Sequence, residues 1–369
     1  MRVVLFCHSL MSDWNNRHAH FLRGIATELQ ARGHEVTAYE PVNGWSRTQL
    51  LAHAGADAEE RFRQAFPTLD VVAFDLHLLS LEDALYDADL VLVHEWTDPK
   101  VVERIGRHKA KRGRYVLLFH DTHHRSAANA DDIAGYDLQH YDGVLAFGEV
   151  IREQYLRRGW SRRVWTWHEA ADIRVFHPRT PPDQRRHVIW IGNWGDGERS
   201  TEITNYIINP VRELALTATV YGVRYPEAAR RALKAAGIDY KGWLPNDETP
   251  KAYAAHQFTV HIPRHSELPG IPAIRVFEAL ACGVPLVIPE WRDVEGLFSP
   301  GLDYLVAQNP TDMRDWCTAL SADASLRRAL AQHGLDTIRR RHTCAHRVDE
   351  LLAVFHHLRG RPQPEVMSV

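Results

Sequence analysis

The sequence predicts an α/β protein built from two doubly wound parallel sheets. Short apolar runs recur along the chain, helical or polar stretches separate them, and a proline-rich segment interrupts the series near the middle. Strands that alternate with helices are typical of parallel sheets, whose strands are buried on both faces. A chain of 369 residues is also long enough to form two hydrophobic cores.

The first half of the chain contains a series of strand-like runs and one clear amphipathic helix. Phe21, Leu22, Ile25 and Leu29 recur at helical spacing, and Gly33 follows them as a C-cap. The expected strands cover residues 2–8, 34–41, 71–74, 88–94, 114–120 and 143–147.

A second series of the same kind follows the segment HPRTPPDQRRH at 177–187, which has the composition of a linker. Strands are expected at 187–194, 217–222, 240–245, 258–263 and 285–290, and helices at 227–237, at 275–283 and from about 323 onward. The predicted domains are residues 1–178 and 179–345, and residues 346–369 form a terminal helix and tail.

Composition is that of an ordinary folded protein, with 45% hydrophobic and 25% charged residues. Lys and Arg number 44 against 47 for Asp and Glu, so the protein has no net positive charge that would attract nucleic acid as a partner. The apolar runs are too short to span a bilayer, and the start lacks the apolar core of a signal peptide. Cys7, Cys282, Cys317 and Cys344 have no CxxC spacing, so we expect a reducing, cytoplasmic location without structural zinc or disulfides.

Candidate site residues follow the predicted strands, because open parallel sheets bind ligands at the carboxyl ends of their strands. The loop from His8 to His18 contains Trp14, Asn16 and Arg17 ahead of a helix. Its backbone amides and the helix dipole can hold an anion. The alternative is an ordinary capped loop with Asn16 as the N-cap.

Two histidine-containing segments, HEW at 94–96 and HDTHHR at 120–125, also follow buried strands. His94 and His120 can donate to a sugar hydroxyl or a phosphate, or accept a proton near neutral pH. His120 and Asp121 with His123 and His124 can also be read as metal ligands or as a surface loop. Their spacing is not one of the common zinc patterns, so polar lining of a ligand site is the preferred interpretation.

The second half contributes a glycine-containing loop and an Arg/Glu helix. In WIGNWGDGERS, the segment Gly192, Asn193 and Trp194 lets backbone approach a phosphate, and Arg199 adds charge at the helix start. A flexible turn is the alternative, since the dinucleotide spacing GxGxxG is absent. Further on, Arg264 or Arg275 can hold a diphosphate and Glu278 can accept from ribose hydroxyls. The alternative is an intrahelical Arg275–Glu278 ion pair.

The segment FEALACGVPLV resembles the donor-site helix of the group 1 glycosyltransferases of the GT-B fold. IGNWGDGERS, GWLPNDETP, HIPR, RVFEALACG and RHTCAHRVDELL resemble the CgeB-like (spore-maturation type) subgroup. The resemblance extends from about residue 1 to about residue 355. It implies two Rossmann-like domains that face a cleft, with acceptor on the first, nucleotide-sugar on the second, and a terminal helix returning to the first.

The resemblance also implies roles for individual residues. Glu278 corresponds to the ribose-binding glutamate, Trp243 and Leu244 to the base-holding segment, and His120 to the histidine against the donor sugar and phosphate. Trp14, His18 and His94 are then on the acceptor side. His120 and Asp121 are the expected catalytic residues.

The sequence departs from the family pattern at three places. Gly270 stands where many retaining members have a second glutamate, so a retaining outcome is expected but an inverting one stays open. Asn16 and Arg17 replace a Gly-Gly pair in the first loop, and the usual Arg-x4-Lys phosphate pair is missing. Arg17, Arg264 and Arg275 are candidates to supply the missing charge, with Arg199 the nearest basic residue to the lost pair.

The function expected from these observations is metal-independent transfer of a hexose from a nucleoside diphosphate sugar, preferably UDP-linked, without any further cofactor. The acceptor is open: a glycan, a protein, a lipid or a small metabolite. The alternatives are a nucleotide-sugar epimerase on the same scaffold and a non-catalytic protein that binds nucleotide-sugars.

Overall fold

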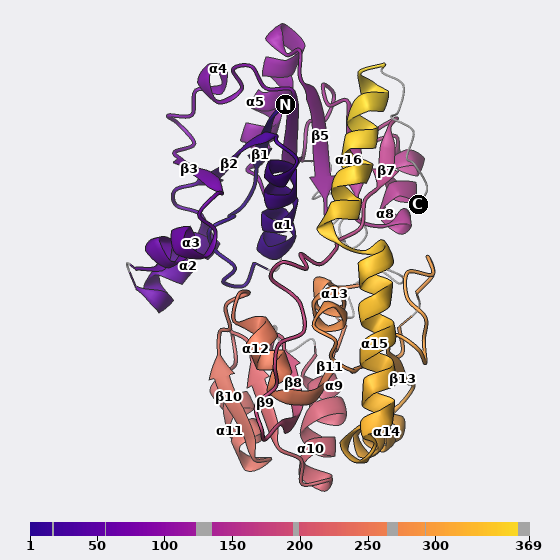
Figure 1. Ribbon diagram of the computed structural model, residues 1–369. Coiled ribbons are helices and arrows are strands. Elements are labelled where there is room, and N and C mark those ends of the chain that lie inside the picture. Colours follow the sequence, from indigo (N-terminus) through magenta and orange to yellow (C-terminus); the bar gives the residue numbers. More distant parts are fainter. Residues whose placement is uncertain are drawn as a thin grey trace. The chain divides into compact units, whose positions relative to one another are not determined.

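The computed structural model describes residues 1–16, 18–55, 57–122, 135–194, 199–263, 272–291 and 293–360 (Figure 1). The chain divides into two compact units. Unit 1 is formed by residues 1–169 and 344–369, and unit 2 by residues 170–343. The sequence-based borders were 178/179 and 345/346.

Unit 1 contains, within its described residues, a seven-stranded parallel sheet in the order β3-β2-β1-β4-β5-β6-β7. Most of the strands are short buried runs, as the apolar segments predicted. The strands are β1 Arg2–Phe6, β2 Glu35–Pro41, β3 Asp70–Phe74, β4 Leu90–His94, β5 Val116–Asp121, β6 Gly143–Ala146 and β7 Val164–Thr166.

Helices cover the sheet of unit 1, and two of them lie side by side. Helix α1 (His18–Ala31) buries Phe21, Leu22, Ile25 and Leu29, and Gly33, with a φ of +81°, follows its end as predicted. Helix α16 (Cys344–Leu358) packs along α1 (Figure 1), so the terminal helix returns to the first domain, which confirms the expected connection. The others are α2 Trp45–Ala54, α3 Ala58–Ala65, α4 Leu81–Ala84, α5 Pro99–Arg112 and α8 Glu149–Arg158.

Unit 2 contains a six-stranded parallel sheet in the order β10-β9-β8-β11-β12-β13 among its described residues. Its strands are β8 Arg186–Ile191, β9 Ala218–Tyr221, β10 Ile238–Gly242, β11 His256–Val260, β12 Leu286–Pro289 and β13 Leu305–Ala307. Its helices are α9 Ser200–Ile203, the π-helix η1 Thr204–Ile208, α10 Asn209–Glu213, α11 Glu227–Ala235, α12 Thr249–Ala254, α13 Ile274–Ala281, α14 Pro310–Ala322 and α15 Ala324–Arg341. Two hydrophobic clusters, one containing Trp190 and the other Phe277, form its core.

The strand order places a topological switch point in each sheet. In unit 1 the chain runs outward from β1 to β2 and then returns to β4 on the other side of β1. In unit 2 the corresponding reversal lies between β8 and β11. Ligands of open α/β sheets bind beyond the carboxyl ends of the strands at such points. The segments after β1, β4, β8 and β11 therefore lie where ligands of such sheets bind.

No helix in the described part of the chain is long and apolar enough to cross a membrane.

Candidate active site

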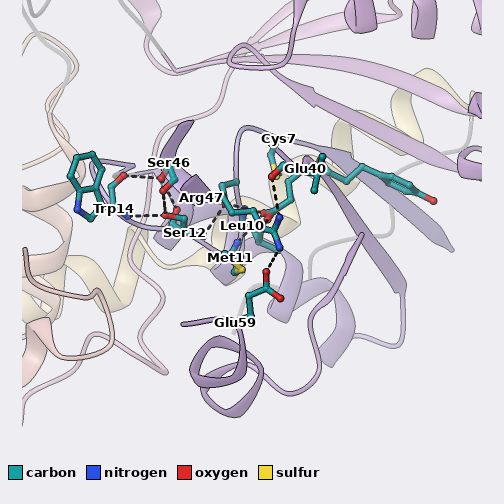
Figure 2. A network of polar contacts seen from close by, with 12 residues as sticks. Cys7, Leu10, Met11, Ser12, Trp14, Glu40, Ser46, Arg47 and Glu59 are labelled. Atoms are coloured by element: carbon teal, nitrogen blue, oxygen red, sulfur yellow. Dashed lines mark hydrogen bonds and ion pairs between the residues drawn. The ribbon is translucent and has the colours of Figure 1, made fainter. Parts of the chain in front are cut away.

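The loop after β1 is built around the carboxylate of Glu40, which lies buried near the end of β2 (Figure 2). Its Oε2 accepts hydrogen bonds from the backbone nitrogens of Leu10 (2.7 Å) and Met11 (3.1 Å) and from the hydroxyl of Ser9 (3.0 Å). Burial raises the pKa of Glu40, and these three donors oppose that shift. The amides of Leu10 and Met11 therefore hold an anion that belongs to the protein itself.

Arg47 of α2 balances this buried charge. Its Nε lies 3.6 Å from Glu40 Oε1, and its guanidinium also pairs with Glu59 of α3. The carboxylate is thus held between two amides, a hydroxyl and a cation, an arrangement that stabilises a buried anion. Sequence reasoning missed Glu40, because it belongs to a strand whose alternation is ordinary.

The rest of the first loop is braced by short side chains. Ser46 Oγ lies 2.7 Å from the carbonyl of Trp14 and 2.8 Å from Ser12 Oγ. The amide of Asn16 donates to the carbonyls of Ser9 (2.8 Å) and Ser12 (2.9 Å). Asn16 thus stabilises the loop with donated bonds, whereas an N-cap side chain accepts one. Arg17 lies outside the described residues.

A second polar group lies where α1 begins and where β4, β5 and β7 end. His18 Nδ1 is 2.6 Å from the buried Glu169 Oε1. Thr122 donates to Glu95 Oε1 at 2.7 Å, and its hydroxyl lies 3.4 Å from His18 Nε2 and 3.3 Å from His94 Nε2. The structure therefore brings together His18 and His94, both predicted on the acceptor side.

Burial, followed by repulsion from His18 and His8, holds the pKa of His94 well below its usual range. Burial and then the charge of His18 also lower the pKa of His8. His94 is therefore a neutral imidazole at neutral pH. A neutral ring can accept a proton or a hydrogen bond through its unprotonated nitrogen.

His120 and Asp121 point in different directions, because neighbouring residues of a strand face opposite sides of the sheet. His120 is fully buried beside Trp167 (ring centroids 4.7 Å apart), His94 and Phe21 of α1. Neither of its ring nitrogens has a hydrogen-bond partner among the described residues. Asp121 Oδ2 instead accepts from the hydroxyl of Tyr155 on α8, at 2.9 Å. The two side chains therefore lie on opposite faces of the sheet, and the catalytic role expected for each of them stays a prediction.

The described part of the chain contains no group of three or more His, Cys, Asp or Glu side chains arranged to hold a metal ion. His123 and His124, which the alternative metal interpretation needs, lie outside the described residues.

In unit 2, the loop after β8 is held by hydrogen bonds to its own backbone. Asn193 Oδ1 accepts from the backbone nitrogen of Val223 (2.8 Å), and the carbonyl of Gly192 accepts from Tyr225 (2.8 Å). A Cβ at Gly222, whose φ is +149°, would lie 2.0 Å from that same carbonyl, so glycine is required there. Trp194 packs into the core near Tyr225.

Arg199 serves this loop in a way that the sequence did not suggest. It is buried, and its guanidinium donates to the carbonyl of Ile262 (3.1 Å), just after β11, and to the carbonyl of Asn193. It therefore ties together the two loops that flank the switch point of the sheet.

Glu278 and Arg275 lie on α13, whose first turn contains no acidic residue. Arg275 Nη1 is 2.5 Å from Glu278 Oε2, so the ion pair weighed from the sequence is formed. The Glu278 side chain is 1% exposed and that of Arg275 is 22% exposed. A buried carboxylate beside a cation is a charge-assisted hydrogen-bond acceptor. Arg264 lies outside the described residues.

Trp243 and Leu244 directly follow β10 and are half-buried. Leu244 packs against the core cluster that contains Tyr253 and Phe277. The predicted base-holding segment therefore lies at the carboxyl edge of the sheet of unit 2.

Part of the sequence matches a known protein family. Residues 199–353 match a family model described as glycosyl transferase-like. No curated protein has a significant match to the chain.

Solved structures resemble the chain over nearly its whole length. HepE of Anabaena, in complex with UDP-glucose, is 14% identical with a TM-score of 0.68, covering 96% of this chain and 100% of that one. Sucrose-phosphate synthase from Thermosynechococcus elongatus is 12% identical (TM-score 0.66, covering 98% and 99%). A glycosyltransferase from Rickettsia africae is 10% identical (TM-score 0.64, covering 98% and 99%). The chain has the GT-B fold. The CgeB-like subgroup stays a prediction.

Proposed function

We propose that this GT-B protein is a glycosyltransferase that moves a hexose from a UDP-linked donor to a separate acceptor. The observation that carries the proposal is the buried carboxylate of Glu278 on α13, which the resemblance aligns with the ribose-binding glutamate and which lies within the residues that match the glycosyl transferase-like model. The crystal structure of HepE, which shares the fold over its full length, contains UDP-glucose.

The donor site is proposed at the carboxyl edge of the sheet of unit 2. Glu278 accepts hydrogen bonds from the ribose hydroxyls, and Trp243 and Leu244 hold the base. The backbone of residues 192–194 faces the phosphates, in a loop shape that Arg199 maintains.

Burial of Glu278 makes this binding conditional on a local rearrangement. Its side chain is 1% exposed, and Arg275 now occupies one of its oxygens. On binding, Arg275 releases the carboxylate to the ribose and turns its charge toward the diphosphate. The exchange keeps the carboxylate paired with donors throughout, which a buried anion requires.

Departure of the diphosphate is proposed to need no metal ion. Positive charge from Arg275 and the positive end of the α13 dipole stabilise the negative charge that develops on the leaving group. Arg17 and Arg264 stay as predicted further contacts to the phosphates.

In unit 1, His18 and His94 are proposed to face the acceptor. Glu169 orients His18 through a 2.6 Å contact, the arrangement by which a carboxylate fixes an imidazole for hydrogen bonding or proton transfer. His120 and Asp121 support this edge from within the sheet. Retention of the donor's anomeric configuration is part of the proposal, since the group 1 resemblance favours it, and NMR of the product's anomeric proton tests it.

Calorimetric titration of the full chain with UDP, GDP, ADP and inorganic phosphate tests the donor site. The proposal expects UDP to bind more tightly than the other nucleotides, and phosphate to bind weakly. Absence of binding by every nucleoside diphosphate would contradict it.

A further inference from the structure

Four aromatic side chains lie on neighbouring segments at the carboxyl edge of the sheet of unit 1, outside the polar groups assigned above. They are His8 after β1, Trp14 in the same loop, Trp45 at the start of α2, and Trp96 after β4. Strands β2, β1 and β4 are adjacent in the sheet, so the segments that follow them are neighbours as well.

Ring contacts join these four residues into two pairs, which together we call the aromatic edge. Trp14 and Trp45 pack edge to face with ring centroids 5.1 Å apart, and His8 and Trp96 are 5.8 Å apart. The backbone segments that carry the two pairs lie close together at Gly44, the residue before Trp45, where a Cβ would lie 3.3 Å from the carbonyl of His8. Trp45 is 47% exposed and Trp96 is 38% exposed.

The aromatic edge is held in place by the Glu40 network. Ser46, the neighbour of Trp45, contacts the carbonyl of Trp14. Earlier in the same loop, Glu40 binds the backbone nitrogens of Leu10 and Met11 (Figure 2). Figure 2 shows the Trp14 ring pointing away from these polar contacts. Rings whose backbone is fixed lose little conformational freedom when they bind a ligand.

The same network indicates the charge of the ligand. The amides of Leu10 and Met11 and the hydroxyl of Ser9, the donors that an anion would use, are already bound to Glu40. The Trp14 indole nitrogen, in contrast, is buried with no hydrogen-bond partner among the described residues. A hydroxyl of a neutral ligand can accept from that nitrogen once the Trp14 ring turns to expose it, which relieves an unsatisfied donor.

We propose that the aromatic edge binds a neutral carbohydrate and thereby defines the acceptor class. A pyranose ring has an apolar C–H face and hydroxyls around its rim. The face packs on indole rings, and the rim meets the polar groups between them, here His8 and the Trp14 nitrogen. The inference rests on the proposed glycosyltransferase function, because it names the substrate that receives the sugar.

The test is binding of the full chain to an array of neutral and anionic oligosaccharides, with the best neutral binder then measured by calorimetry. Trp45→Ala should weaken that binding about tenfold. Trp45→Phe should weaken it less, and Tyr86→Ala should leave it unchanged. Tyr86 is a matched control, since it is 70% exposed and precedes β4, at the opposite edge of the sheet.

Three results would overturn the inference: no neutral glycan binds, Trp45→Ala binds as the wild type does, or anionic glycans or phosphatidylcholine vesicles bind in preference. UDP titration of the same samples separates this inference from the proposed function. If the protein binds UDP but Trp45→Ala does not change glycan binding, the result contradicts the proposal for the aromatic edge and leaves the proposed transferase function standing. Glycan binding that depends on Trp45, without any UDP binding, counts against the transferase.

Discussion

Two buried ionisable side chains, Glu278 and His120, differ in how the protein satisfies their polar atoms. Glu278 is bound by Arg275 at 2.5 Å, whereas neither ring nitrogen of His120 has a hydrogen-bond partner among the described residues. A paired buried carboxylate offers a strong acceptor that a ligand can use. An unpaired buried imidazole costs stability, because its nitrogens have lost water without replacing it.

Glu278→Gln should weaken UDP binding by about 1.5 to 3 kcal/mol, the contribution of a hydrogen bond to a charged group. The glutamine has nearly the same shape, so the melting temperature should change little by comparison. Calorimetric titration with UDP measures the effect.

Glu248→Gln is the matched control for this change, since the exposed side chain of Glu248, the N-cap residue of α12, pairs with Lys251 three residues further along. It should bind UDP as the wild type does. Equal affinities in wild type, control and Glu278→Gln would disprove the ribose assignment.

His120→Phe should leave the melting temperature at pH 7 unchanged or raise it, because the phenyl ring fills the site without unsatisfied polar atoms. Burial, with His94 and His18 nearby, holds the pKa of His120 well below its usual range. Such a group contributes stability above the unfolded-state pKa, about 6.5, that is lost as the pH falls. The melting temperature of the variant should therefore drop less than that of the wild type between pH 7 and pH 5.

His256→Phe is the control for His120→Phe. His256 is also buried, but its two ring nitrogens lie 2.7 Å from the carbonyl of Ala252 and 2.8 Å from the hydroxyl of Thr219. Its loss should destabilise the protein by about 1 to 3 kcal/mol, since buried partners are left unpaired. A larger loss of stability in His120→Phe than in His256→Phe would show that the ring nitrogens of His120 have polar partners in the folded protein.

At the scale of the elements, function depends on loops that a few side chains hold together. Arg199 links the loop after β8 to the loop after β11, and Glu40 links the loop after β1 to the end of β2. In both units these loops flank the switch point of the sheet. The charged residues here shape the site by binding backbone.

Arg199→Ala should lower the melting temperature by roughly 4 to 8 °C, because two buried carbonyls lose their donor, a cost of about 2 kcal/mol in a unit of this size. Arg199→Lys should recover part of that loss. Thermal unfolding measures both variants. If Arg199→Ala keeps its melting temperature and only loses UDP affinity, Arg199 contacts the donor phosphates instead.

Most strands could be predicted from the sequence, whereas the site could be predicted only in part. The apolar composition of runs such as 88–94 and 114–120 predicts strands. Strands β7 and β13 have three residues each, which is too few to show a hydrophobic pattern. His18 and His94 could be found because His18 ends the loop that follows the first strand and His94 ends a buried strand. Glu169, which contacts His18, could not be predicted, because 151 positions of sequence separate the two residues and no local pattern marks Glu169.

At the scale of the whole molecule, two parallel sheets each present a different kind of chemistry at their carboxyl edges. Unit 2 presents a charged pair and a glycine-bearing loop, which suit a nucleotide. Unit 1 presents imidazoles, a buried carboxylate network and the aromatic edge, which suit a neutral hydroxylic acceptor. This division of chemistry is the basis of the proposed transfer between two substrates.

Transfer should be insensitive to excess chelator, because the proposed stabilisation of the leaving diphosphate uses Arg275 and the dipole of α13. Rates measured with and without EDTA should agree. Activity that disappears with EDTA and returns only with a divalent ion would point to a metal-binding role for residues 120–124.

The most direct test of the central claim is product analysis after incubation of the wild-type protein with UDP-glucose and the neutral glycan that binds best. A glycosyltransferase releases UDP and adds one hexose to the glycan, and mass spectrometry of both products detects this. We expect the two products in equal amounts, with both reduced in Glu278→Gln. Conversion of UDP-glucose to an isomer without any change in the glycan would identify an epimerase. If none of the donors that bind is consumed with any of the acceptors that bind, the protein is a non-catalytic nucleotide-sugar-binding protein. Either result would contradict the proposed transfer.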